Sequence, residues 1–250
     1  MLRRSPVAVG MGKNLSFIID GMFNRKWLAL SMSLLAFCAL GGAQNSDRSP
    51  EAVRKLVREY REMNEARIVR DYAKLLSLPN VAADTPNIRA NASFIMDLLK
   101  QRGFSTRALS VPGAPPAVYG ELTSPGARHT LLWYAHYDGQ PVDKAQWASD
   151  PWQPVLREGA VDSRAIPLDS LKPPLNPEWR IYARSTGDDK APIQALLTAI
   201  DALKAAKVPL SVNLKVFFEG EEEAGSSHLE KIFRENTDVL KGDLWLLSDG

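Results

Sequence analysis

The chain has 250 residues, and its 31 Lys and Arg against 29 Asp and Glu give a formal net charge of +2. This near balance of charge, in a composition that is 45% hydrophobic, is that of an ordinary globular protein and gives no reason to expect a nucleic-acid partner. The single cysteine, Cys38, excludes a disulfide framework and a cysteine-based zinc site.

The N-terminal region has the pattern of a secretory signal peptide, which we place at residues 1–43. A basic pair, RK, precedes the uncharged apolar run WLALSMSLLAFCAL, and the small residues GGA follow it. The run is short for a membrane-spanning helix, so a retained anchor is the less favoured alternative. We therefore expect export to the periplasm or the cell exterior, a mature chain of residues 44–250, and no stable membrane association after cleavage. The true start is Met1 or Met22, because the pattern begins just after Met22.

Two helices are predicted next. Apolar residues recur at helical spacing over residues 50–78, which predicts one long amphipathic helix or two, ended by Pro79. A second helix is predicted from Asn87 to Arg102, with Gly103 as its C-terminal cap.

The rest of the chain alternates between strands and helices. Alternating or continuous apolar runs bounded by turn residues predict strands over residues 105–111, 117–123, 129–139, 179–185, 212–220 and 243–250. Helices are predicted over 192–206 and after a cap at Ser226 or Ser227, and a loop with little regular structure over 141–178. The alternation predicts an α/β domain with a mostly parallel mixed sheet and helices on both faces.

Polar residues fall at four predicted strand ends. They are His136 with Asp138, Asp188 with Asp189, the run Glu221, Glu222 and Glu223, and Asp249. Each group alone has an ordinary explanation, such as a polar strand end, acids at a helix start or a solvated turn. Ligands bind beyond the carboxyl ends of strands in sheets of this kind, so the four groups together favour one shared site. One histidine with several carboxylates is a suitable ligand set for zinc, cobalt or manganese.

The spacing within two of these groups indicates that their residues have different roles, one as a metal ligand and the other as its support or as a general base. His136 and Asp138 are two residues apart, so on an extended segment they project to the same side, and Asp138 could hold one imidazole nitrogen while the other binds metal. Of two adjacent glutamates, one can ligate a metal while the other acts as a general base. His129 and His228 lack acidic neighbours at ligand spacing, and we expect them to be surface or core residues.

The motifs YAHYDGQPVD, RSTGDDKAP, FFEGEEEAGSS and LLSDG occur in this order. Together they resemble the co-catalytic zinc peptidases of metallopeptidase family 20, which include carnosinase-like dipeptidases, aminoacylase, carboxypeptidase G, and the acetylornithine and succinyl-diaminopimelate deacylases. The resemblance covers residues 51–250, and HYDGQPVD with WASDPW is most similar to the dipeptidase branch. It implies the zinc-peptidase three-layer fold, two divalent metal ions, with zinc ahead of cobalt or manganese, and hydrolysis of dipeptides or short peptides. An N-acyl amino acid deacylase of the same family is the alternative.

The resemblance also implies roles for the site residues. His136 would bind the first metal with Asp138 as its hydrogen-bonding partner, and Asp249 would complete the ligands of that metal. Asp188 would bridge the two metals, and Glu223 would bind the second.

Glu222 would then be the general base that activates the bridging water. A register shift of one residue would instead make the pair Glu221 and Glu222. Asp189 would be structural.

The sequence departs from the family pattern in two places. Lys190-Ala191 stands where the family usually has Lys-Gly. The inserted lid domain and the late histidine that ligates the second metal have no counterpart in the 250 residues, so a catalytically incomplete metal-binding fragment is a further alternative. Family members often dimerise through the lid, so a homodimer is expected only of a full-length form. A serine hydrolase is disfavoured because no Gly-x-Ser-x-Gly motif is present.

Overall fold

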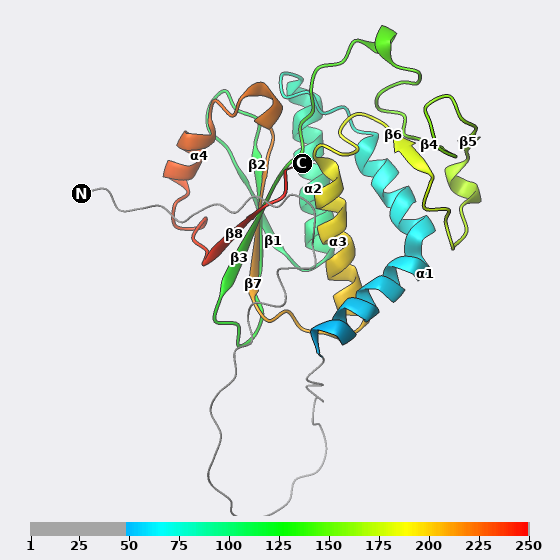
Figure 1. Cartoon of the computed structure of the whole chain (residues 1–250). Helices are drawn as coiled ribbons and strands as arrows, with labels where there is room; N and C mark the ends of the chain where they lie inside the picture. Colours follow the sequence, from blue (N-terminus) through cyan, green and yellow to red (C-terminus); the bar gives the residue numbers. More distant parts are fainter. Residues whose placement is uncertain (1–48, 250) are drawn as a thin grey trace, which may run out of the picture.

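The computed structural model describes residues 49–249 (Figure 1). The predicted signal peptide lies outside these residues, so export stays a prediction. Within the described range, no helix combines the length and the apolar character needed to cross a membrane.

A five-stranded mixed sheet forms the centre of the molecule, with the strand order β1-β2-β7-β3-β8. The strands are β1 (Ser105–Leu109), β2 (Ala117–Leu122), β3 (Thr130–His136), β7 (Asn213–Glu219) and β8 (Leu244–Leu247). Strand β3 pairs in parallel with β7 and β8, whereas β2 pairs antiparallel with both β7 and β1. Since only β2 opposes the other four strands, the predicted mixed α/β sheet is confirmed, and β3, β7 and β8 deliver their carboxyl ends to the same edge.

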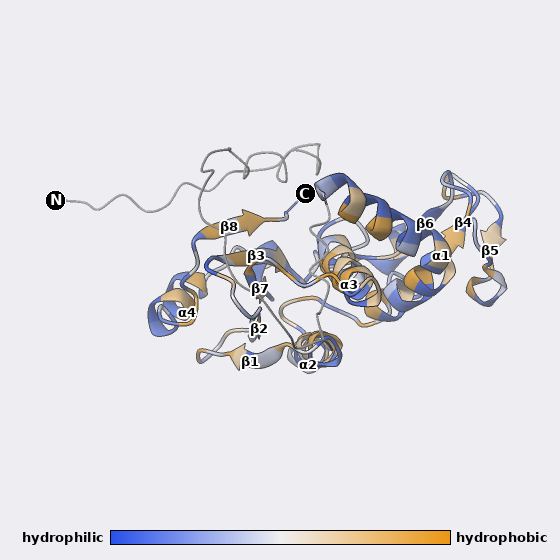
Figure 2. Cartoon of the chain, turned by 90° about the horizontal axis from the view of Figure 1, so that it is seen from below, coloured by the Kyte–Doolittle hydropathy of each residue, from blue (hydrophilic) through white to orange (hydrophobic). Residues whose placement is uncertain are grey.

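Helices cover both faces of this sheet, as predicted. They are α1 (Pro50–Leu76), α2 (Thr85–Gln101), α3 (Lys190–Ala205) and α4 (Leu229–Glu235). Seen from below, α2 and α3 lie on one side of the row of strands and α4 on the other, with α1 beyond α3 (Figure 2).

The alternation of side chains along β7 explains the two layers. Val216 and Phe218 point into a core with α2 and α3, whereas Phe217 points to the opposite face. There the Phe217 ring lies 5.1 Å from the ring of Phe233 in α4. A strand that is buried on both faces needs this continuous apolar run, which is what the sequence shows.

Helix ends mostly follow the local signals. Asp84 accepts a hydrogen bond from Asn87 N at 3.3 Å and so starts α2 two residues earlier than predicted. Gly103 follows α2 with φ +86°, the left-handed conformation expected of a terminating glycine.

The predicted serine cap of α4 is wrong. His228 occupies the cap position, and Ser226 lies in the preceding turn with φ +51°. The N–H of Ser226 is used there in a hydrogen bond to Glu221 O at 2.9 Å. The turn that follows β7 therefore uses this serine before the helix begins.

The segment between β3 and α3 differs in part from expectation. It contains a separate antiparallel sheet of β5 (Ala165–Ile166), β4 (Val155–Arg157) and β6 (Arg180–Tyr182), with short 3-10 turns η2 (Lys144–Gln146) and η3 (Leu168–Ser170). The strand predicted over 179–185 exists, but it joins this small sheet and not the central one. Buried side chains of the small sheet and its loop pack on Ala66 of α1.

Candidate metal centre

The acidic groups predicted to meet do lie at one edge of the central sheet. His136 ends β3, and Asp249 lies two residues beyond the end of β8. The η4 turn (Glu222–Ala224) follows β7. Asp188 reaches this edge differently from the expectation, because it comes from the loop that joins the small sheet to α3.

His136, Asp188 and Asp249 form a group that could hold a metal ion. One donor atom of each lies within 4.8 Å of the other two. His136 Nε2 is 2.8 Å from Asp188 Oδ1 and 3.8 Å from Asp249 Oδ1. The His136 side chain is fully buried, while the side chains of Asp188 and Asp249 are 54% and 47% exposed, so Nε2 faces an accessible cluster of oxygens. An imidazole nitrogen with carboxylate oxygens is a donor set that fits zinc, cobalt or manganese.

Asp138 connects this histidine to the glutamate turn. Its Oδ1 lies 3.3 Å from His136 Nδ1, the ring nitrogen that faces away from Asp188, and both side chains are fully buried. The two Asp138 oxygens also accept hydrogen bonds from the backbone N–H groups of Glu222 and Glu223, each at 3.1 Å. One carboxylate therefore orients the imidazole and fixes the turn that carries two glutamates.

The three consecutive glutamates separate into different surroundings. Glu222 Oε2 lies 3.7 Å from His136 Nε2 and faces the metal group. Glu223 accepts a short hydrogen bond from Gln140 Nε2. Glu222 is thus the member of the run whose carboxylate lies beside His136, and the assignment of Glu222 and Glu223 as the functional pair stays a prediction.

Glu221 turns away from the metal group toward His228. Its Oε1 accepts from His228 N at 2.7 Å, and its Oε2 lies 3.0 Å from His228 Nδ1. His228 thus has an acidic partner that the sequence analysis did not foresee. The seven-residue separation is bridged by the turn at Gly225, which has φ +89°.

Asp189 lies beneath the histidine as a buried support. Its Oδ2 accepts a hydrogen bond from His136 N at 3.0 Å, and the Asp188–Asp189 peptide bond is cis. Burial, with contributions from Asp249 and Asp188, raises the pKa of Asp189 to about 7, although the hydrogen bond from His136 opposes this change. Its position agrees with the structural role implied by the resemblance.

The electrostatics of the cluster favour a cation. Burial lowers the pKa of His136, but the carboxylates of Asp138, Asp189 and Glu222 outweigh it and raise that pKa to about 9. The pKa of Glu222 is raised by its partial burial and by Asp249, against the opposing effect of His136. Several carboxylates that share one positive imidazole are under-neutralised, which is the condition that a bound divalent ion relieves.

Sequence reasoning missed Lys190, although it stands inside a quoted motif. Its buried Nζ donates to Leu75 O at 2.9 Å, to Leu78 O at 3.2 Å and to Asn91 Oδ1 at 2.8 Å. Burial lowers the pKa of Lys190 to about 7. Lys190, the first residue of α3 and the neighbour of Asp189, is thus hydrogen-bonded to the C-terminal end of α1, to the loop that follows it and to α2.

Glu219, which ends β7, was also missed. It is 1% exposed, and Tyr134 Oη donates to its Oε2 at 2.8 Å. Burial raises the pKa of Glu219. The next residue must be Gly220, because a Cβ there would lie 2.6 Å from Tyr137 Cζ and 3.1 Å from Pro115 Cβ.

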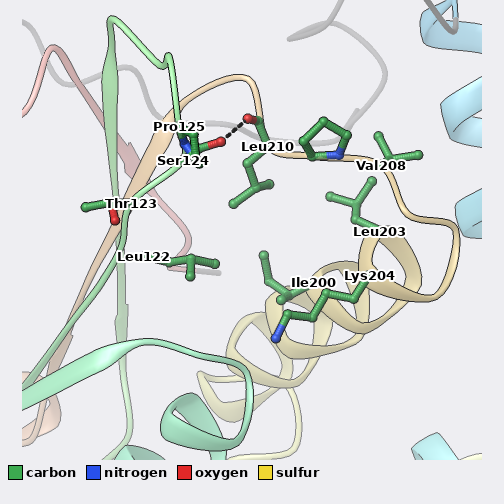
Figure 3. Close-up of a pocket in the computed structure, with 10 residues that line it drawn as sticks. Leu122, Thr123, Ser124, Pro125, Ile200, Leu203, Lys204, Val208 and Leu210 are labelled. Carbon is green, nitrogen blue, oxygen red and sulfur yellow. Dashed lines mark hydrogen bonds between the residues drawn. The ribbon is translucent and has the colours of Figure 1, made fainter. Parts of the chain in front are cut away.

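An apolar pocket of about 200 Å³ lies at the opposite end of the sheet and not at this centre (Figure 3). Its walls come from the end of β2 and the loop after it, the last turns of α3 and the segment before β7, including Leu122, Pro125, Ile200, Leu203 and Leu210. A hydrogen bond from Ser124 Oγ to Leu210 O closes one side. None of the residues that line the pocket is acidic, so it is not a second candidate for a metal centre.

Comparison with known proteins bears directly on this edge of the sheet. Residues 132–243 match the model of peptidase family M20/M25/M40. This stretch of the chain is therefore an M20-family peptidase domain. The matched range contains every site residue named above except Asp249, and the M20 assignment agrees with the resemblance seen in the sequence.

Relatives agree with the assignment. The human Beta-Ala-His dipeptidase is 30% identical over 183 residues, which are 69% of this chain and 32% of the relative. The Cys-Gly metallodipeptidase DUG1 of Candida albicans is 31% identical over 175 residues, which are 64% of this chain and 32% of the relative. The solved M20 metallo-carboxypeptidase Sso-CP2 of Sulfolobus solfataricus is 30% identical with a TM-score of 0.58, over 73% of this chain and 37% of that one. The chain thus spans about a third of the length of the curated relatives it matches.

Proposed function

We propose that this chain supplies the metal-binding part of a metallopeptidase that hydrolyses dipeptides or short peptides. The observation that carries the proposal is the group of His136, Asp188 and Asp249 donor atoms beside the carboxylate of Glu222. The match to family M20 and the dipeptidase names of two relatives support the substrate class.

The positions of the donor atoms suggest which side chains would hold the divalent ions. His136, Asp188 and Asp249 would hold one divalent ion, and Asp188 with Glu223 would contribute to a second. A bound ion of this kind polarises the scissile carbonyl and lowers the pKa of a coordinated water. Zinc is the ion proposed, with cobalt and manganese as substitutes that suit the same donors.

Two residues of the chain would handle the proton and the histidine. Glu222 would accept a proton from the attacking water and donate it to the leaving amine, a task that suits a carboxyl whose pKa is raised. Asp138 would keep the His136 ring in one orientation through Nδ1. Asp138 also accepts a hydrogen bond from the backbone N–H of Glu222, which would fix the general base relative to that ring.

The substrate can be narrowed by experiment. Hydrolysis of N-acetyl or N-succinyl amino acids in preference to dipeptides would instead assign the deacylase alternative. For a longer form of the protein we also propose a homodimer, as the resemblance implies.

The test combines metal content with activity. The purified chain would be loaded with zinc, its bound metal counted by elemental analysis, and hydrolysis followed on a panel of dipeptides and N-acyl amino acids. We expect Glu222→Gln to bind metal normally and to lose at least about 100-fold in kcat, because general base catalysis contributes on this scale. Glu230→Gln is the matched control, since Glu230 is exposed on α4 and forms an ion pair with the equally exposed Arg234.

Two results would contradict the proposal. Hydrolysis that survives Glu222→Gln would remove the assigned base, and a chain that binds no zinc would remove the metal centre. Metal binding without hydrolysis of any substrate would instead favour the catalytically incomplete metal-binding fragment.

A further inference from the structure

Asn80, between α1 and α2, makes hydrogen bonds with both groups of its side-chain amide while wholly buried. Its Nδ2 donates to Tyr137 O at 2.8 Å and to Ser185 Oγ at 2.9 Å. Its Oδ1 accepts from Trp152 Nε1 at 3.3 Å, and its backbone oxygen accepts from Gly139 N at 2.9 Å. A buried amide group without a partner is costly, and both groups of the Asn80 amide are paired with segments that are distant in the sequence.

The partners of Asn80 flank the metal group on two separate loops. Tyr137 lies between His136 and Asp138, and Ser185 precedes Asp188 by three residues. Ser185 Oγ also donates to Asp138 O at 3.3 Å, which closes the link between the loops. One side chain, 57 and 105 positions away from its two acceptors, therefore joins the segments that carry the histidine and the bridging aspartate.

The contact between these loops leaves little free space. A Cβ at Gly139 would collide with Ser185 Oγ and lie 3.0 Å from Arg184 Cδ. Ser185 itself has φ +62°, a left-handed conformation that costs energy for a serine and that it keeps only where its surroundings hold it. The hydrogen bond from Asn80 is one of the forces that hold Ser185 in place.

We propose that Asn80 is a positioning residue that sets the separation of His136 and Asp188, and through it the metal affinity of the site. The inference rests on the proposed function of this edge as a metal centre. It assigns Asn80 a role beyond that of an ordinary buried asparagine, whose loss would lower stability without changing the affinity of a folded protein.

The first test is a titration of the metal-free chain with Co²⁺, followed by visible absorption, which reports the ligand geometry. It uses Asn80→Ala and Ser185→Ala, at a temperature where each variant is folded. Because outer partners of metal ligands typically contribute 10- to 100-fold in affinity, we expect Kd to rise about 10-fold or more for Asn80→Ala and less for Ser185→Ala. The double variant should be no weaker than Asn80→Ala alone by more than about twofold, since both changes break the same link.

The control is Asp201→Asn. Asp201 pairs with Arg102 at 2.6 Å between α2 and α3, far along both helices from the metal group. The Asp201→Asn variant should have a lower unfolding temperature than the parent chain, while its Kd for Co²⁺ should stay within about twofold of the parent value. If Asn80→Ala and Ser185→Ala behave like this control, Asn80 is only a stabilising residue and the proposal is overturned.

A crystal structure of metal-free Ser185→Ala, and of Asn80→Ala where it folds, decides the question independently of metal binding. We expect the distance from His136 Nε2 to Asp188 Oδ1 to exceed 3.5 Å in the variants, against 2.8 Å in the parent chain. An unchanged distance would overturn the positioning role. If the parent chain itself binds no Co²⁺, the proposed metal centre fails, while this distance still decides whether Asn80 sets the geometry.

Discussion

Glu221, Glu222 and Glu223 are adjacent in sequence, but their carboxylates meet three different partners. Glu222 faces His136, Glu223 meets Gln140, and Glu221 meets His228. Three carboxylates in a row repel one another when they share one surface, and their separation among different partners reduces this repulsion. The backbone oxygen of Glu221 also accepts hydrogen bonds from the N–H groups of Ala224 and Ser226, so Glu221 stabilises the turn through both its backbone and its side chain.

Glu221→Ala should therefore destabilise the turn. The change leaves the His228 N–H and ring without their acceptor, and the expected loss is about 1–2 kcal/mol in the free energy of unfolding, measured by urea denaturation. Glu230→Ala, on the exposed face of α4, should stay within about 0.5 kcal/mol of the parent.

A double-mutant cycle with His228→Ala would separate the side-chain pair from the bond to the backbone. We expect a coupling energy of about 0.5–1 kcal/mol, because the ring of His228 is partly exposed. Additive losses would show that the two side chains do not stabilise each other.

Contacts between residues that are close in the sequence could be predicted, whereas contacts between distant segments could not. The relation of His136 to Asp138 is local, so the two-residue period of a strand was sufficient to predict that both face one side. The partners of Glu221 and Asn80 are fixed only when distant segments meet, and neither residue type nor spacing signals them. The sequence did not predict the acidic partner of His228 for this reason, because the turn after β7 brings Glu221 and His228 together.

At the scale of elements, the fit of α2 on the sheet requires a glycine in β2. A Cβ at Gly120 would lie 2.9 Å from Val216 Cγ2 and 3.3 Å from both Leu99 Cδ1 and Phe104 Cδ1. These neighbours belong to the main core between the sheet and the helices, where little movement is possible.

Gly120→Ala should lower the free energy of unfolding by about 1–3 kcal/mol through overpacking. Gly159→Ala is the control, because a Cβ there meets nothing within 4 Å, and it should be neutral or slightly stabilising. Equal unfolding midpoints for the two variants in a urea titration would show that α2 can shift to accept the methyl group.

The elements themselves followed from the sequence where the periodic signal was long. The central strands and the helices α1, α2 and α3 have enough residues for their apolar spacing to be distinctive. The strands β4, β5 and β6 contain three, two and three residues, too few for any period, so their pairing into a second sheet could not be predicted. The cap of α4 was misplaced because Ser226 lies in the preceding turn with φ +51°, which is not the extended backbone conformation of an N-cap residue.

At the scale of the whole molecule, export is a prediction of the sequence alone. Expression of the full chain in a bacterium, followed by N-terminal sequencing of the periplasmic fraction, should give a mature protein that begins near Gln44. A protein that keeps its first 43 residues and stays in the membrane fraction would favour the retained anchor.

Metal binding should stabilise the whole fold because the centre draws its ligands from three distant segments. His136, Asp188 and Asp249 come together only in the folded chain, so an ion that binds them favours the folded state by mass action. At a free metal concentration 100 times Kd the gain is about 2.7 kcal/mol, which corresponds to a rise of roughly 5–10 °C in Tm for a domain of this size. Relief of repulsion among the site carboxylates acts in the same direction.

The measurement is thermal unfolding of the chain with zinc and after treatment with a chelator. His136→Asn should abolish the metal-dependent rise in Tm, because it removes the only nitrogen donor of the group. His129→Asn is the matched control and should keep the full rise, since His129 is exposed and lies near Asp243, at the start of β3 and therefore at the opposite end of that strand from His136. A rise that persists in His136→Asn would mean that zinc stabilises the chain through other residues, and the assignment of this edge as the metal centre would then be wrong.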